Sequence, residues 1–365
     1  MPRDLTHVII ADDILKRSKD SWAKGIADQS VALHMGAIAH DSFLYGPSPK
    51  LSTKMHGGFG DDPRAPALAM LDDVRAEKNP ELKAKKKAFA FGFLSHMAVD
   101  SVFHPFVYSV SGSQVPENNS SKEGEDLAKA RHRYAETWLD VHFLREKGLT
   151  FNNFRPMRKI VHNIGDSRML ADFFCKNYQK AYHIDRDVSS DFRRGMLVQL
   201  AIGKVTQNQN IGSMLRRLDD YTGGKLKLAV SGFYQNDRQI PELMTSFTSF
   251  THPVTGETVH KNLNDLTEES IVCGTKYMRA AESYIKTGDR SAFMRAVSDR
   301  NLDTGVGNTK LADIKKARPA DIQDLKGTKF NAFMAEKPVK KMPSGVKNEA
   351  VRQRMKLSLN SRGRF

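Results

Sequence analysis

The sequence predicts an all-α fold: a single large helical bundle followed by a basic, partly extended C-terminal arm. Apolar residues recur at spacings of three and four over long segments, which is typical of amphipathic helices. The sequence lacks the regular alternation of apolar and polar residues that would indicate a β-sheet. The charge is uneven, because the 365 residues carry a formal net charge of +15 and residues 305–365 hold 15 Lys or Arg against 5 Asp or Glu.

The helical spacing defines segments that we take in chain order. They cover residues 9–17, 30–39, 66–75, 80–103, 121–146, 191–202, 242–250 and 268–286. Clusters of glycine, proline and serine mark loops between them, and residues 251–260, with Pro253 and Gly256, predict a short hairpin. We therefore expect one helical domain over residues 1–300 and a basic tail over residues 301–365.

The composition excludes several classes of protein. Hydrophobic residues make up 39% and charged residues 27%, a balance that a mostly disordered chain does not have. No segment reaches the roughly 20 apolar residues of a membrane span. Two cysteines make no disulfide framework, and the first residues lack a secretory signal pattern. We expect a cytoplasmic protein, or one exported without a cleaved N-terminal signal.

Two histidine–carboxylate pairs carry the main chemical signal. His96 and Asp100 lie four residues apart, as do His132 and Glu136, and this spacing places both side chains of a pair on one face of a helix. Imidazole nitrogen and carboxylate oxygen are zinc ligands. Asp100 lies in an apolar run, where a carboxylate needs a cation or a hydrogen-bonded histidine to compensate its charge.

The spacing continues beyond the first pair. His104 follows at the next four-residue step, and Pro105 disfavours helical geometry at the residue before it, so the sequence predicts that this helix ends at His104. Three other pairs share the four-residue spacing: His142 and Glu146, His162 and Asp166, His183 and Asp187. We interpret those as exposed ion pairs on helices.

The ligand candidates follow a characteristic order along the chain. His7 lies in the first helix, Asp41 ends the second, and His56 lies in a glycine-rich loop. The two histidine–carboxylate pairs come next, with His104 between them. This order resembles the zinc-dependent phospholipase C family, relatives of the enzymatic domain of clostridial alpha-toxin and, more distantly, of the S1/P1 nucleases. The matching motifs cover residues 6–140.

The resemblance implies an all-α bundle around two or three zinc ions. It implies two ligand sets: His56, His96 and Asp100 for one zinc, and His104, His132 and Glu136 for a second. A third zinc would be bound by His7, with Asp100 bridging to the first. Asp41 would lie beside the metals as a general base or as the residue that orients the attacking water.

The sequence departs from the family pattern at two places. Secreted members begin with a processed tryptophan whose amine binds zinc, whereas Trp22 and Trp138 are internal here. The chain would therefore bind two zinc ions, or a third through His7 and other groups. His40 stands where many relatives have proline, and we favour a neutral neighbour of the site over an additional ligand. Residues that could orient the ligands are Ser95, Tyr134 and Asp140.

The expected function is that of a zinc-dependent phosphodiester hydrolase, with phospholipase C-type cleavage of a glycerophospholipid by metal-activated water. Two alternatives remain open: a nuclease-like phosphodiesterase acting on single-stranded nucleic acid, and a non-catalytic zinc-stabilised scaffold with a basic tail for assembly. The basic tail is either a solvated extension or a binding element for an anionic membrane surface or for nucleic acid.

Overall fold

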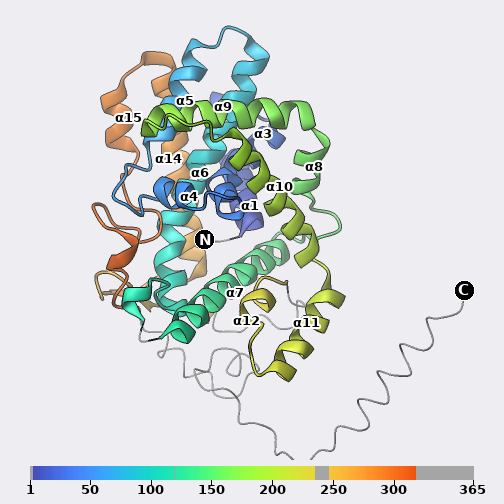
Figure 1. Ribbon diagram of the computed structural model, residues 1–365. Helices are drawn as coiled ribbons and strands as arrows, with labels where there is room; N and C mark the ends of the chain where they lie inside the picture. The colour runs from blue at the N-terminus through green and yellow to red at the C-terminus, as the bar shows by residue number, and fades with distance from the viewer. Residues whose placement is uncertain (1–2, 120, 235–245, 318–365) are drawn as a thin grey trace, which may run out of the picture.

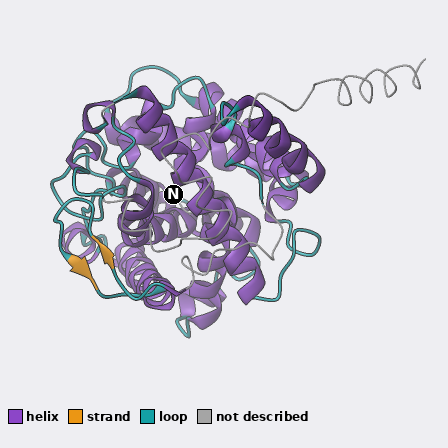
Figure 2. Cartoon of the chain, turned by 90° about the horizontal axis from the view of Figure 1, so that it is seen from below, coloured by secondary structure: helices purple, strands orange, loops and turns teal. Residues whose placement is uncertain are grey.

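The structure is a computed structural model that describes residues 3–119, 121–234 and 246–317. Figure 1 shows its helices, which in chain order are α1 (Asp4–Arg17), α2 (Ser21–Lys24), α3 (Ser30–Ser42), α4 (Lys50–Met55), α5 (Ala65–Ala76), α6 (Pro80–Ser111), α7 (Lys122–Glu146), α8 (Pro156–His162), α9 (Ile164–Tyr182), α10 (Ser189–Thr206), α11 (Gln209–Thr222), α12 (Lys227–Val230), α14 (Leu263–Thr287) and α15 (Arg290–Ala296). Strands β1 (Phe250–Thr251) and β2 (Thr258–Val259) form a small antiparallel hairpin at the periphery (Figure 2).

This arrangement confirms the predicted all-α bundle and the predicted hairpin. Seven of the predicted helical segments match observed helices. The segment 242–250 lies partly outside the described residues, and its last residue begins β1. The sequence patterns did not identify α9 and α11. No helix in the described part of the chain is long and apolar enough to cross a membrane.

Helix α6 is the central element of the bundle. Figure 1 shows it running through the middle of the molecule, where it packs against α3, α14, α5 and α7. Asn79 caps its first turn by accepting hydrogen bonds from the backbone N–H groups of Glu81 and Leu82. From Ala88 to Ser111 every residue is buried, which is expected of a helix surrounded by other elements on all sides.

The prediction that α6 ends at His104 is wrong, because the helix continues through Pro105 to Ser111. A proline inside a helix removes one backbone hydrogen bond and costs about 3 kcal/mol. The residues beyond it, among them Phe106 and Val107, are buried in the hydrophobic core. Their burial offsets the cost of the proline, since each contributes roughly 1.5–3 kcal/mol.

Helices α3 and α6 approach each other unusually closely. A Cβ atom at Gly36 would overlap the backbone carbonyl of Phe89, and a Cβ atom at Gly92 would overlap that of Leu33. Each helix therefore uses a glycine at the point where it meets the backbone of the other. This contact sets the separation of the two helices.

The segment after α15 packs against the helical body. Leu302 and Ile314 are buried, although both lie in the region that we assigned to the basic tail. The residues from 318 onwards, which carry most of the basic charge expected there, lie outside the described part of the chain. Residues beyond 300 thus pack against the helical body at least as far as Ile314.

Replacement of Gly36 or Gly92 by alanine should destabilise the protein by about 3 kcal/mol or more, because the helices would have to separate. The matched control is Gly203→Ala in α10, where no heavy atom lies within 4 Å of the added Cβ. That change should be neutral or stabilise by about 0.5–1 kcal/mol, since alanine has the higher helix propensity. Urea unfolding measures both, and equal stability of the three variants would contradict the close crossing.

Candidate metal centre

Side chains from α1, α3, α6, α7 and the end of α4 converge at one buried centre between the helices. The structure brings together all eight residues that the sequence singled out. They form three groups in which the potential ligand atoms lie within 4.8 Å of one another: His7, His96 and Asp100; Asp41, His56 and His96; His104, His132 and Glu136. Every one of these side chains is buried.

Helix geometry explains how α6 supplies three of them. His96, Asp100 and His104 lie on successive turns of one face. Because α6 continues through Pro105, His104 stays in line with the other two rather than turning away at a helix end. On α7, His132 and Glu136 show the same spacing, with Nε2 of His132 lying 2.9 Å from Oε1 of Glu136.

Asp100 lies at the middle of the centre and contacts three imidazoles. Its Oδ1 is 3.2 Å from Nε2 of His7, and its Oδ2 is 3.2 Å from Nε2 of His56 and 2.9 Å from Nε2 of His96. The same Nε2 of His56 is 3.6 Å from Oδ1 of Asp41. One carboxylate thus links the groups that contain His7, His56 and His96.

These distances fit the geometry of bound zinc. Ligand atoms that share one tetrahedral zinc at 2.0–2.1 Å lie about 3.3 Å apart. The buried Nε2 of His96 and both oxygens of Asp100 have no well-formed hydrogen bond within the described structure, despite their proximity. A shared cation accounts for polar atoms that lie this close together without donating to one another.

The opposite edge of three imidazoles is fixed by backbone carbonyl groups. Nδ1 of His96 donates to Ala37 O at 2.8 Å, Nδ1 of His56 to Ser52 O at 2.8 Å, and Nδ1 of His104 to Leu302 O at 2.6 Å. Each bond leaves Nε2 as the nitrogen that faces the centre, which is how metal-binding histidines are normally oriented.

These partners differ from the ones that the sequence suggested. Asp140 accepts hydrogen bonds from the N–H and hydroxyl groups of Thr6 at 2.8 and 2.7 Å and from Tyr234 at 2.7 Å. It therefore anchors the start of α1, which carries His7. Ser95 is buried without a hydrogen-bond partner among the described residues. Tyr134 packs against Trp138, with ring centroids 4.7 Å apart.

His40 lies beside the ligands without joining any of the three groups. Its ring stacks between those of His96, at 4.2 Å, and Phe93, at 3.7 Å. Burial holds the pKa of His40 well below its usual value, so the ring is neutral. This position agrees with a neutral neighbour of the site.

A model of the zinc-dependent phospholipase C family matches residues 6–194, a range that contains all eight residues of the centre. The chain belongs to the zinc-dependent phospholipase C family. The family is zinc-dependent and acts on phospholipids, and the histidine and aspartate groups of this member suit that metal. Searches among curated proteins and among solved structures found no match.

Electrostatics in this phospholipase C-type centre favour neutral imidazoles and ionised carboxylates. Burial lowers the pKa of His104 and of His132. Burial alone would raise the pKa of Asp100, but the surrounding histidines hold it well below its usual value. Neutral imidazole and ionised carboxylate are the forms that bind metal.

His56 and Asp41 behave differently from the rest. Burial would lower the pKa of His56, but its contact with Asp100 and the charge of Asp303 raise it to about 9. Burial raises the pKa of Asp41 well above its usual value. In the absence of metal, His56 therefore carries a proton at neutral pH.

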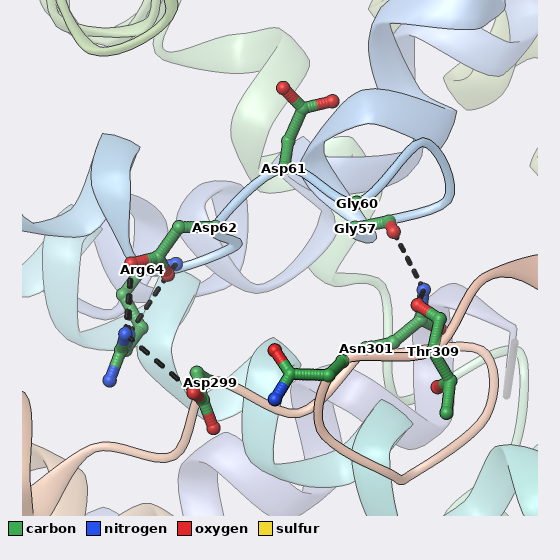
Figure 3. Close-up of a pocket in the computed structure, with 9 residues that line it drawn as sticks. Gly57, Gly60, Asp61, Asp62, Arg64, Asp299, Asn301 and Thr309 are labelled. Atoms are coloured by element: carbon green, nitrogen blue, oxygen red, sulfur yellow. Dashed lines mark hydrogen bonds and ion pairs between the residues drawn. The ribbon is translucent and has the colours of Figure 1, made fainter.

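A separate cavity of about 200 Å³ lies beside the glycine-rich loop that follows His56 (Figure 3). Asp61 pairs with Lys54, and Asp62 pairs with Arg64. The acidic side chains that line this cavity are thus largely neutralised by cations, and none of them belongs to the metal centre.

Zinc binding to the metal-free protein should release a proton from His56 at pH values below about 9, because zinc takes the place of that proton. The apparent zinc affinity should therefore rise with pH towards about 9. Titration calorimetry at pH 7.5 in buffers of different ionisation enthalpy measures the released protons. His162→Ala, on an exposed histidine, is the control, and heats independent of the buffer would refute the prediction.

Proposed function

We propose that this chain hydrolyses a glycerophospholipid at the bond between phosphorus and the glycerol oxygen, releasing diacylglycerol and a phosphorylated head group. One observation carries the proposal. Eight residues in the order of the zinc-dependent phospholipase C family converge, with buried side chains, on a single centre. Family membership supports the reaction class, and the donor set supports the metal.

The three groups support binding of two or three zinc ions. His104, His132 and Glu136 would hold one ion on the α7 side of the centre. The other two groups share His96 and lie around Asp100, so His7, His56, His96 and Asp100 would hold one ion or two, with Asp41 beside them. When bound, zinc polarises phosphoryl oxygens and lowers the pKa of a coordinated water.

Asp41 is the residue that we propose to accept the proton of the attacking water. Its Oδ1 is buried and has no hydrogen-bond partner among the described residues. The raised pKa of Asp41 makes it a stronger base than an exposed aspartate. As the water oxygen bonds to phosphorus, its proton passes to Asp41; the bond to the glycerol oxygen breaks, and that oxygen takes up the proton that Asp41 carries, which returns Asp41 to its ionised form.

The residues that hold the ligands keep this geometry fixed during the reaction. Ala37, Ser52 and Leu302 orient His96, His56 and His104 through backbone carbonyl groups. Because the orienting groups belong to the backbone, they do not exchange rotamers. The centre is therefore preorganised, which is the main source of electrostatic catalysis in enzymes.

Asp41→Asn should retain bound zinc and lower turnover by about 10²–10⁴-fold, since the amide cannot accept the proton. Elemental analysis reports zinc per chain, and release of the phosphorylated head group reports turnover. Asp28→Asn removes the same charge from an exposed residue and serves as the control. Undiminished turnover in Asp41→Asn would remove Asp41 from the mechanism.

The substrate class is tested by parallel assays on phosphatidylcholine vesicles, phosphatidylglycerol vesicles and single-stranded DNA. We expect phospholipid hydrolysis that is abolished by a chelator and restored by zinc. Cleavage of DNA alone would replace the proposal by the nuclease-like alternative. Zinc-loaded protein without activity on any of these substrates would favour the non-catalytic scaffold.

A further inference from the structure

A short loop outside the family match, residues 301–306, connects two parts of the metal centre. The N–H group of Leu302 donates to the carbonyl of His56 at 2.9 Å. The side-chain amide of Asn301 donates to the carbonyl of Gly57 at 2.8 Å, a bond drawn in Figure 3. The loop thus holds the segment that carries His56 in place through two hydrogen bonds.

The same loop is fixed against α6. Gly305 has φ +70°, and a Cβ atom there would lie 2.6 Å from the carbonyl oxygen of Ser101 and 2.7 Å from Cγ of Pro105. Only glycine combines this backbone conformation with so close an approach. Proline leaves the carbonyl four residues earlier without its usual helical donor, and Gly305 packs at that position.

The conformation of the loop is set by Asn301. Its Oδ1 accepts hydrogen bonds from the backbone N–H groups of Asp303, at 2.9 Å, and Thr304, at 3.0 Å. This turn directs the carbonyl of Leu302 at Nδ1 of His104, at 2.6 Å. The loop therefore determines which nitrogen of His104 faces the metal.

Asp303 adds a carboxylate next to the same imidazole. Its Oδ1 lies 3.6 Å from Nδ1 of His104, and its side chain is 13% exposed. No lysine or arginine in the described ranges pairs with it, whereas Asp299, which is 55% exposed, lies 4.0 Å from Arg64. Among the described residues the cationic or potentially cationic groups near Asp303 are the imidazoles of His104 and His56, and a largely buried carboxylate in such a place is compensated further when those histidines bind a cation.

We propose that the loop 301–306 is part of the metal centre, and that Asp303 is a positioning residue that strengthens zinc binding through His104. The inference rests on the proposed zinc-dependent function. The N–H group at Nδ1 of His104 donates to Leu302 O, so Asp303, 3.6 Å from that nitrogen, acts through its negative charge, which stabilises a cation bound by the same imidazole. Loss of a group that supports a ligand from outside lowers metal affinity by about 10–100-fold.

The test uses full-length, zinc-loaded protein and competition with a chelator, read out as zinc retained per chain. Asp303→Asn should release the zinc held by His104, His132 and Glu136 at a chelator concentration about 10–100-fold lower than the wild type requires. Asp303→Glu, which keeps the charge, should restore most of the retention. Asp299→Asn removes the same charge from the same segment and should match the wild type.

Gly305→Ala provides a second variant that leaves every side chain of the centre unchanged. It should displace the loop and weaken the same zinc. Wild-type retention in both Asp303→Asn and Gly305→Ala would overturn the inference while leaving the proposed function intact. A wild-type protein that binds no zinc would instead refute the proposed function, and the inference with it.

Discussion

The close contact between α3 and α6 at Gly36 and Gly92 is the constraint on which the metal centre depends. Because neither glycine has a side chain, the backbones meet directly. The carbonyl of Ala37 on α3 then accepts the hydrogen bond of His96 on α6. The same approach stacks the ring of His40 on that of His96 and brings Asp41 to the ligand face of α6.

The metal centre contains a carboxylate, that of Asp100, in an apolar core that cannot solvate its charge. Asp100 is fully buried on α6, and its neighbours on the same helix, Phe93, Val99 and Phe103, are buried and apolar. A buried ionised carboxylate is stable only when paired or bound to a metal. The histidines around it provide part of that compensation. A cation bound at this position would compensate the buried negative charge and so stabilise the folded protein. Metal binding and the stability of the fold are therefore coupled.

The ligands could be predicted from the sequence, because spacing on a helix and apolar context are local properties. His96, Asp100, His132 and Glu136 are examples. The backbone carbonyl groups that orient the histidines could not be predicted, because they belong to segments that only the tertiary fold brings next to each ring. The helix end at His104 was predicted wrongly for a related reason: the local cost of Pro105 is visible in the sequence, but the packing that offsets it is not. Leu302 and Asp303 were not singled out, because the many Lys and Arg residues that follow them led us to assign the whole segment to a basic tail.

The hydrogen bond between His104 and Leu302 joins residues 198 positions apart in the chain, and this separation has a consequence for biosynthesis. A growing chain has made every ligand by residue 136, long before the residue that orients His104 emerges. Contacts of such long range form late and slowly during folding. From residue 136 until residue 302 is made, the chain thus carries the ligands without the carbonyl group that orients His104. The centre of such a chain becomes complete only after residue 302 has been made.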